Sequence, residues 1–269
     1  MKKAYATAIC HGDTYSPGVE ALGKSLRAHG TDVPMVAMVT SDVSAAARRG
    51  LTEQGWHVRE VEPIQNPNPA SSLLFPRFSQ VFTKLRAWEL CDYDKVVFLD
   101  ADTLVLQNVD ELFDRREIAA APDFFMADRF NSGVMVLEPS EETFGRMLHA
   151  LASEESYDGG DQGFLNQFFH DWYAMGVEHR LPAGYNMHHF VYQFLQRHAA
   201  VYKDLDREVK IIHYTLQKPW IGKATVTGGS GVWWETYFDA HPEKAAGWKR
   251  RLHLLEDWSF DAVVGAISS

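Results

Sequence analysis

Short apolar runs alternate with amphipathic segments along the first hundred residues of the chain. Apolar runs of this length, bounded by loop residues, predict strands. The four runs that predict strands are 4–10, 33–40, 56–64 and 95–99. Apolar residues at helical spacing, such as Val19, Leu22 and Leu26, predict helices between the strands. The three expected helices are 16–29, 41–53 and 78–90, with Ser16 as the N-cap of the first and Pro17 after it.

This order of elements predicts the class of fold. Strands that alternate with helices form a mainly parallel sheet with helices on both faces, which is a three-layer α/β architecture. A loop rich in Pro and Asn, 65–72, separates the third strand from the third helix. In such sheets, ligands bind beyond the carboxyl ends of the strands. Residues that directly follow a strand are therefore the first candidates for a functional site.

The second half of the chain is less regular, but its pattern predicts several elements. These are a turn at 131–133 leading into a strand, a helix over 141–152, a glycine-rich turn that opens a helix near 161, a strand ending in His213 and a terminal helix over 242–255. No internal repeat and no linker divides the chain. We therefore expect a single domain over 1–269.

Composition and charge exclude several classes of protein. The formal net charge is −10, which disfavours a nucleic-acid partner because such a partner requires a basic face. The chain has two cysteines, Cys10 and Cys91, outside any CxxC pair, so a reducing compartment is expected. No stretch approaches about 18 consecutive apolar residues, and the apolar stretch at the start of the chain is too short for a signal peptide. We therefore expect a cytoplasmic protein without a membrane span.

Two aspartates, Asp100 and Asp102, follow the fourth predicted strand. Carboxylates are hard oxygen ligands that suit Mn²⁺ or Mg²⁺, and such an ion can also hold a diphosphate. For the pair taken alone, a solvated turn in which Asp102 caps the following residues is the simpler interpretation. A third interpretation is a phosphohydrolase of the haloacid-dehalogenase type with Asp100 as nucleophile. That pattern fits poorly, because Thr103 directly follows Asp102 and because the pair lies far from the start of the chain.

Six motifs in order resemble the glycogenin-like glycosyltransferases of family 8. They are FTKLRAWEL (82–90), FLDADTLVLQNVDELFD (98–114), FNSGVMVLEPS (130–140), DGGDQGFLNQFF (158–169), LPAGYNM (181–187) and IIHYTLQKPW (211–220). The resemblance covers roughly residues 4–220 and leaves 221–269 as an unmatched C-terminal extension. It implies the GT-A fold, a Rossmann-like α/β/α architecture. It also implies transfer of a sugar from a nucleotide sugar, usually a UDP-sugar, with Mn²⁺.

The resemblance assigns the metal and the diphosphate to two parts of the chain. Asp100 and Asp102 match the metal-binding pair, with Ala101 between them at the donor site, and His213 matches the third protein ligand. Lys218 matches a lysine that contacts the diphosphate. The spacer between His213 and Lys218 is one residue shorter than in glycogenin-type chains and lacks their glycine. The resemblance therefore does not extend to a backbone contact with phosphate in that loop.

The resemblance also assigns residues to the donor sugar. Asp161 and Gln162 match a pair near the anomeric carbon, and these two with Lys84 are the expected catalytic residues. The other residues implied at the sugar and the phosphates are Arg77, Asn131, Ser132, Gly133, Asp158 and Gly160. Without the resemblance, the glycine-rich turn is simply a helix N-terminus, and 131–133 is a plain turn.

Thr7, Ala8 and Tyr15 match the uridine pocket, in which Tyr15 can stack on the base. The implied function is a retaining hexosyltransferase that uses UDP-glucose or UDP-galactose with Mn²⁺, or with Mg²⁺ as the alternative ion. Retention can follow a same-face displacement or a double displacement through Asp161 or Gln162. The acceptor is open and is a sugar, a polyol, a lipid or a protein. The family includes dimers, so a homodimer also stays open.

Three further features allow alternative interpretations. Tyr192 lies one position from the self-glucosylated tyrosine of glycogenin in a gapless alignment, so it is either an acceptor or a packed aromatic. His188 and His189 have no partner at metal-ligand spacing and are expected to be packed or exposed. Trp233 and Trp234 either stack on an acceptor or pack against the terminal helix. A non-catalytic sugar-nucleotide-binding protein is disfavoured because the implied site residues are all present.

Overall fold

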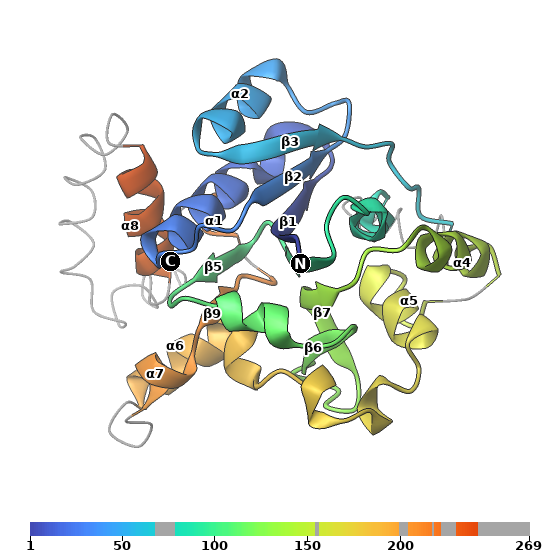
Figure 1. Cartoon of the computed structure of the whole chain (residues 1–269). Helices are drawn as coiled ribbons and strands as arrows, with labels where there is room; N and C mark the ends of the chain where they lie inside the picture. Colours follow the sequence, from blue (N-terminus) through green and yellow to red (C-terminus); the bar gives the residue numbers. More distant parts are fainter. Residues whose placement is uncertain (68–78, 154–155, 199–203, 217, 222–229, 242–269) are drawn as a thin grey trace, which may run out of the picture.

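The computed structural model describes residues 1–67, 79–153, 156–198, 204–216, 218–221 and 230–241. Within these ranges the chain forms a six-stranded sheet and a three-stranded sheet (Figure 1). The strands of the large sheet are β1 (Lys3–Ile9), β2 (Met35–Val39), β3 (Trp56–Glu60), β4 (Lys95–Leu99), β6 (Ala119–Pro122) and β7 (Phe130–Leu137). Their order is β3-β2-β1-β4-β7-β6.

The four strands predicted in the first hundred residues form the parallel part of the large sheet. β1 lies between β2 and β4, β3 flanks β2, and all three pairings are parallel. β7 and β6 add an antiparallel edge beyond β4. The structure thus confirms the predicted mainly parallel α/β sheet. The third strand is shorter than predicted and ends at Glu60.

Alternate side chains of β1 enter two different cores, because successive residues of a strand point to opposite faces. Tyr5 and Ile9 pack with α1 and α2 on one face, whereas Ala4 and Ala6 pack with η3, α4 and α5 on the other. The helices concerned are α1 (Ser16–Ala28), α2 (Ala45–Glu53), η3 (Val81–Glu89), α4 (Glu141–Leu151) and α5 (Asp161–Phe168). Figure 1 shows the two groups of helices on either side of the sheet.

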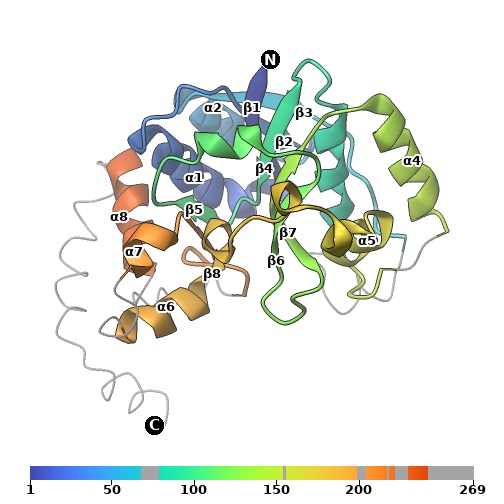
Figure 2. The same cartoon turned by 60° about the horizontal axis from the view of Figure 1, so that its bottom comes forward.

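The small sheet joins distant parts of the chain, in the order β5-β9-β8. Its strands are β5 (Thr103–Val105), β8 (Met187–His188) and β9 (Ile211–His213). Beside it lie α6 (His189–Arg197), α7 (Leu205–Glu208) and α8 (Ser230–Ala240), which Figure 2 shows grouped on the side of the molecule away from α4. Short 3-10 helices complete the fold: η1 (Gly12–Tyr15), η4 (Asp110–Asp114), η5 (Trp172–Ala174), η6 (Val177–His179) and η7 (Ala183–Tyr185).

Two local predictions were wrong, and the type of a third element was left open by the sequence. Residues 131–133 lie within β7 and not in a turn before it, because Phe130 pairs with Pro122 of β6 and the strand is continuous from there. Ser16 is the first residue of α1, and Tyr15 takes the N-cap position. The helix at Val81–Glu89 is a 3-10 helix. Apolar spacing over nine residues does not separate a 3-10 helix from an α-helix.

The tail differs from expectation where the structure describes it. Trp233 and Trp234 lie on α8, a helix that the pattern does not predict. Apolar residues cover most of the circumference of that helix, so it lacks the narrow apolar stripe by which an amphipathic helix is recognised. The predicted terminal helix over 242–255 and the predicted site residue Arg77 lie outside the described residues. Among the helices of the described part, none has the length and apolar character that a membrane crossing requires.

Candidate active site

The end of β4 meets the small sheet, and this junction brings the candidate metal ligands together. The Asp100 N–H donates to the Gly133 carbonyl of β7 (2.8 Å), which holds Asp100 at the end of the large sheet. The chain then turns into β5, where Thr103 pairs with His213 of β9. The His213 side chain therefore lies beside the Asp102 carboxylate, although the two residues are far apart in the sequence.

Asp100, Asp102 and His213 form a cluster with the composition of a divalent-metal site. The His213 Nε2 atom lies 3.2 Å from Asp102 Oδ1 and 3.7 Å from Asp100 Oδ2. One ligand atom from each residue lies within 4.8 Å of the others. Two carboxylate oxygens and one imidazole nitrogen suit Mn²⁺ or Mg²⁺ and leave coordination positions for phosphate oxygens. The donor set therefore fits a divalent ion that also carries a diphosphate.

An amide on the far side of the His213 ring determines which nitrogen faces the carboxylates. The Asn186 amide nitrogen donates to Asn131 Oδ1 (2.9 Å), so the Asn186 Oδ1 atom faces His213 Nδ1 at 2.8 Å. Nδ1 must then carry a proton, so Nε2 is the ring nitrogen that faces the aspartates and the one that could bind a metal ion. Asn186 is not among the site residues predicted from the sequence. Its one signal is an amide within the otherwise mainly apolar motif 181–187.

Asp123 is a buried carboxylate that holds the predicted donor-sugar residues together. Its Oδ2 atom accepts hydrogen bonds from Asn131 Nδ2 (3.3 Å) and Gln162 Nε2 (3.2 Å). The Gln162 Oε1 atom in turn accepts from the Ser132 N–H (3.4 Å). Asp123 is likewise absent from the site residues predicted from the sequence. It directly follows β6, so recognition of that strand would have identified Asp123 as a strand-end candidate.

Lys84 is a buried cation between two carboxylates. Its Nζ atom lies 2.9 Å from Asp100 Oδ1 and 2.6 Å from Asp161 Oδ2. It also donates to Ser132 Oγ (3.1 Å), and that hydroxyl donates to Asp161 Oδ2 (2.8 Å). Burial lowers the pKa of the Lys84 amine, but Asp100 and Asp161 outweigh burial and raise the pKa above its usual value. The amine is therefore charged, and it positions both aspartates.

The two aspartates of the metal cluster differ electrostatically. Burial raises the pKa of the Asp102 carboxyl, but Lys218 and His213 outweigh burial and lower the pKa well below its usual range. For Asp100, burial is the largest effect and Lys84 offsets it only in part, so the pKa is raised; repulsion from Asp102 adds to the rise. Asp102 is therefore anionic. A cation bound between the two carboxylates would reduce the repulsion at Asp100.

These groups line a cavity of about 440 Å³ at the ends of β1, β4 and β7. The predicted site residues that line it are Ala8, Tyr15, Lys84, Asp100, Ala101, Asp102, Asn131, Ser132, Asp158, Asp161, Gln162 and His213. Further lining residues, which the sequence analysis does not single out, are Cys10, His11, Val81, Phe98, Thr215 and Leu216. Because β4 lies between β1 and β7, the residues predicted for uridine and those predicted for the sugar occupy opposite ends of one cavity.

Four predicted residues lie outside the cavity lining. Thr7 is fully buried in β1, and Gly133 lies under the His213 ring. Lys218 pairs with Asp102 and donates to the carbonyl groups of two residues of its own loop. Gly160 is the N-cap of α5.

The glycine-rich turn before α5 caps that helix and also contributes to the wall of the cavity. The Asp158 Oδ1 atom accepts from the N–H groups of Gly160 (2.8 Å) and Gly163 (3.0 Å), so this carboxylate caps the helix. Asp158 also lines the cavity.

The features with alternative interpretations are packed residues. Tyr192 is 4% exposed and belongs to the core beside the small sheet. His188 is buried with its ring centroid 6.0 Å from that of His213. Burial, reinforced by His213, lowers the pKa of His188 to about 4, so its imidazole is neutral. Trp233 and Trp234 are buried on α8, which packs against α1.

Comparison with known proteins identifies the family. Residues 6–224 match the model of the family described as Glycosyl transferase family 8. The chain is a family 8 glycosyltransferase. It is 41% identical to glycogenin-1 of Caenorhabditis elegans over 90% of this chain and 56% of the relative. Because the chain belongs to this family, the interpretation of Asp100 as the nucleophile of a phosphohydrolase is set aside.

Other relatives include a second glycogenin and a glucuronosyltransferase. The chain is 39% identical to glycogenin-1 of Oryctolagus cuniculus, over 81% of this chain and 65% of the relative. It is 37% identical to inositol phosphorylceramide glucuronosyltransferase 1 of Arabidopsis thaliana, over 81% of this chain and 42% of the relative. The chain thus spans between 42% and 65% of the length of these three curated relatives.

Solved structures identify the fold as GT-A, as the motifs imply. The galactosyltransferase LgtC in complex with donor and acceptor sugar analogs aligns with a TM-score of 0.61 at 21% identity, over 91% of this chain and 99% of that chain. The bifunctional glycosyltransferase WbbM aligns with a TM-score of 0.66 at 18% identity, over 94% of this chain and 51% of that chain.

Gly133 provides a test of the metal cluster. A Cβ atom at Gly133 would lie 2.2 Å from His213 Cε1 and 2.5 Å from Nδ1. We therefore expect Gly133→Ala to displace the ring and to weaken Mn²⁺ binding by about tenfold to a hundredfold. Titration calorimetry with Mn²⁺ measures the effect. Gly145→Ala on α4 is the matched control, because its Cβ would meet no atom of the described residues within 4 Å. Equal Mn²⁺ affinity in both variants would contradict the role of His213.

Proposed function

We propose that the chain is a retaining hexosyltransferase that moves a sugar from a UDP-sugar to an acceptor hydroxyl with the help of Mn²⁺ or Mg²⁺. The observation that carries this proposal is the cluster of Asp100, Asp102 and His213 at the centre of the cavity, with Nε2 of the imidazole facing both carboxylates. A bound ion would supply positive charge to the departing diphosphate, as divalent ions do in other phosphate-transfer sites.

The residues at the metal end have separate tasks in this proposal. Asp100, Asp102 and His213 hold the ion, and the backbone at Ala101 lies against the donor. Lys218 pairs with Asp102, and it exchanges this partner for the diphosphate when a metal and a donor bind. Beyond β4, the other end of the cavity receives the base. Ala8 lines it and Tyr15 stacks on uracil, while Thr7 supports the pocket from within β1.

At the sugar end, the contacts of Asp161 favour one route to retention. The Asp161 carboxylate already accepts from Lys84 (2.6 Å) and Ser132 Oγ (2.8 Å), which weakens it as a nucleophile. The Gln162 amide is likewise held by Asp123 (3.2 Å). We therefore infer a same-face displacement in which these residues orient the sugar. The acceptor oxygen bonds to the anomeric carbon, the bond from that carbon to UDP breaks, and the hydroxyl proton passes to the departing diphosphate.

The proposal extends to the identity of the donor and to the compartment of the protein. Two Arabidopsis thaliana relatives are named UDP-glucuronate:xylan alpha-glucuronosyltransferase and inositol phosphorylceramide glucuronosyltransferase, so UDP-glucuronate joins UDP-glucose and UDP-galactose as a donor to test. Cys10 and Cys91 are free thiols, which supports a reducing, cytoplasmic compartment.

A screen of UDP-sugars tests the proposal. We expect Mn²⁺-dependent UDP binding and slow hydrolysis of one UDP-sugar to free sugar and UDP, both abolished by EDTA and restored by Mn²⁺. Titration calorimetry measures binding, and mass spectrometry detects the products. ADP and ADP-glucose are the controls for the base. Absence of UDP binding with Mn²⁺ present would reject the proposal.

The burial of Tyr192 gives a prediction that opposes the self-glucosylating alternative. Because Tyr192 is 4% exposed, we expect that no sugar is attached to its hydroxyl. Incubation with each UDP-sugar and Mn²⁺, followed by intact-mass analysis, should give the same result for the unmodified protein and for Tyr192→Phe. Growth of the mass by hexose units that is lost only in Tyr192→Phe would instead assign the acceptor to this residue.

A further inference from the structure

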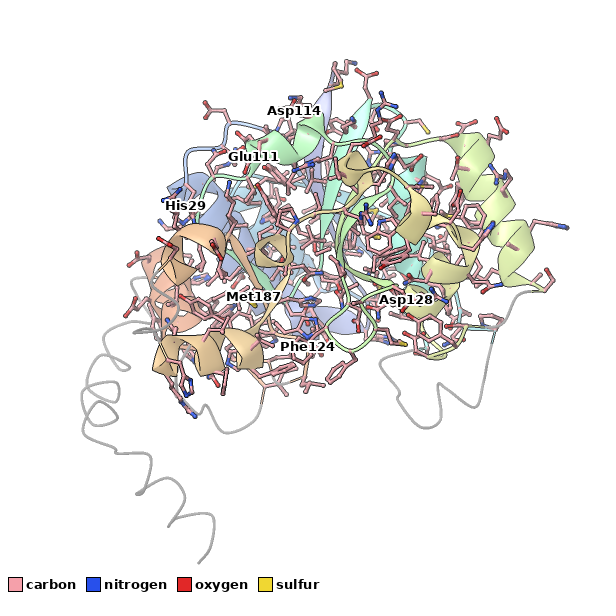
Figure 3. All side chains as sticks on the ribbon, turned by 90° about the horizontal axis from the view of Figure 1, so that it is seen from below. His29, Glu111, Asp114, Phe124, Asp128 and Met187 are labelled. Carbon is pink, nitrogen blue, oxygen red and sulfur yellow. The ribbon has the colours of Figure 1, made fainter. Side chains whose placement is uncertain are left out.

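Apolar side chains gather on the surface beside the sugar end of the cavity. On the loop between β6 and β7, Phe124 is 54%, Phe125 74% and Met126 40% exposed. On α6, Phe194 is 57% exposed and Phe190 is half-buried. We call these five residues the apolar patch. Figure 3 shows Phe124 at the outer edge of the molecule.

The patch is continuous from the loop to the helix. The ring centroid of Phe124 lies 5.1 Å from that of Phe125 and 5.3 Å from that of Phe190. Phe125 also stacks on Phe190 at 6.4 Å. Phe194 follows Phe190 by four residues, so both lie on one face of α6, one turn apart. Contiguous exposed apolar surface of this kind commonly marks a place where something binds.

One carboxylate connects the patch to the sugar end of the cavity. The Asp123 Oδ1 atom accepts from the N–H groups of Phe125 (2.9 Å) and Met126 (3.2 Å). Its Oδ2 atom accepts from Asn131 and Gln162, which line the cavity. The loop of the patch and the residues proposed to hold the donor sugar are therefore positioned by the same side chain.

The His188 imidazole makes a second connection. Its ring centroid lies 6.0 Å from Phe124 and 5.5 Å from Phe190 on one side, and 6.0 Å from His213 on the other. A single ring thus separates the patch from the metal cluster. A molecule that reaches the sugar end of the cavity from this side has to pass over the patch.

The chemistry of the patch selects an uncharged, apolar group. Phe has no hydrogen-bonding group, unlike Tyr and Trp, and Met is only a weak acceptor. The charged residues at the end of the loop, Asp128 and Arg129, pair with each other at 3.0 Å. On α6, the Gln193 amide lies 2.9 Å from His189 Nε2. The five side chains of the patch offer a polysaccharide chain no strong hydrogen-bond partner, whereas they can bury the methylene groups of an alkyl chain.

We propose that the acceptor is an amphiphile whose alkyl or acyl chain lies on the apolar patch while its hydroxyl-bearing head enters the cavity. The alkyl or acyl chain of the acceptor would cross Phe124 and Phe125 and continue along α6 toward Phe194. This inference rests on the proposed function, because an acceptor is needed only if the cavity holds a sugar donor. The formal net charge of −10 disfavours an anionic membrane surface as the occupant.

The test compares the affinity of the protein for n-octyl β-D-glucopyranoside with its affinity for methyl β-D-glucopyranoside. Both glycosides are used below the micelle concentration, with UDP and Mn²⁺ present. Each buried methylene group strengthens binding about fourfold, so burial of two groups already gives a preference of about fifteenfold for the octyl compound. We expect Phe125→Ser and Phe190→Ser to reduce this preference to less than about threefold. Leu148→Ser on α4 is the matched control, because Leu148 is an apolar residue exposed to the same degree as Met126.

The outcomes separate this inference from the proposed function. Failure of the unmodified protein to bind UDP with Mn²⁺ would reject the function itself. Normal UDP binding without an octyl preference, or with a preference that survives both Phe variants, would overturn the inference alone. Self-association in sedimentation velocity, or binding to phosphatidylcholine vesicles without glycoside, would assign the patch to a second copy or to a membrane if the Phe variants abolish it. Either result would also overturn the inference.

Discussion

We expect Asp102→Asn to lower Mn²⁺-dependent turnover of the UDP-sugar by about a thousandfold or more. The substitution keeps the shape of the side chain but removes the charge that faces His213 Nε2 at 3.2 Å and pairs with Lys218. A divalent ion contributes several kcal/mol of charge stabilisation, and each 1.4 kcal/mol corresponds to about tenfold in rate. Mass-spectrometric detection of released UDP and calorimetric titration with Mn²⁺ measure the two effects.

Asp114→Asn is the matched control, because Asp114 is an exposed aspartate on η4, on the surface of the molecule (Figure 3). It should retain the Mn²⁺ affinity and the turnover of the unmodified protein. Turnover by Asp102→Asn within tenfold of the unmodified protein would mean that Asp102 does not hold a catalytic ion.

We expect Lys84→Met to destabilise the folded protein and to abolish its activity. Met replaces the aliphatic stem of Lys84 but leaves Asp100 and Asp161 without the cation that lies 2.9 and 2.6 Å away. Removing one partner of a buried ion pair costs about 3–5 kcal/mol. We therefore expect the free energy of unfolding to fall by about this amount in urea denaturation.

A double variant distinguishes electrostatics from packing. Lys84→Met combined with Asp161→Asn removes one of the two uncompensated carboxylates, so it should be more stable than Lys84→Met alone. Lys2→Met, at an exposed lysine, should leave the free energy of unfolding within about 0.5 kcal/mol of the unmodified protein. A double variant no more stable than Lys84→Met would attribute the loss to packing instead.

Much of the large sheet follows from local sequence. The apolar run that ends at Leu99 predicts β4, and the alternation of runs and helices predicts the parallel order around it. Because ligands bind beyond the carboxyl ends of parallel strands, Asp100 and Asp102 are site candidates from their position alone. The motif resemblance adds His213, Lys84 and Asp161. The structure brings these three together with both aspartates.

Other parts of the site depend on contacts between distant segments. Asn131 belongs to a continuous strand because β6 pairs beside it, and β6 itself has only a short run of small residues. Asp123 and Asn186 act through hydrogen bonds to Asn131, a partner that is distant in the sequence and that the weak local signals at these two positions do not indicate. The apolar patch likewise forms only where the loop after β6 meets α6.

The α/β class, the parallel strands and the aspartate pair at the end of β4 could all be predicted from local sequence. These features depend on the period of apolar residues within one segment, which a short window contains. Three other features emerge only in the folded chain: the nitrogen of His213 that faces the aspartates, the two carboxylates that pair with Lys84, and the apolar surface exposed beside the cavity. These features depend on strand pairing and packing between segments far apart in the chain. A local pattern of residues does not specify which distant segments come into contact.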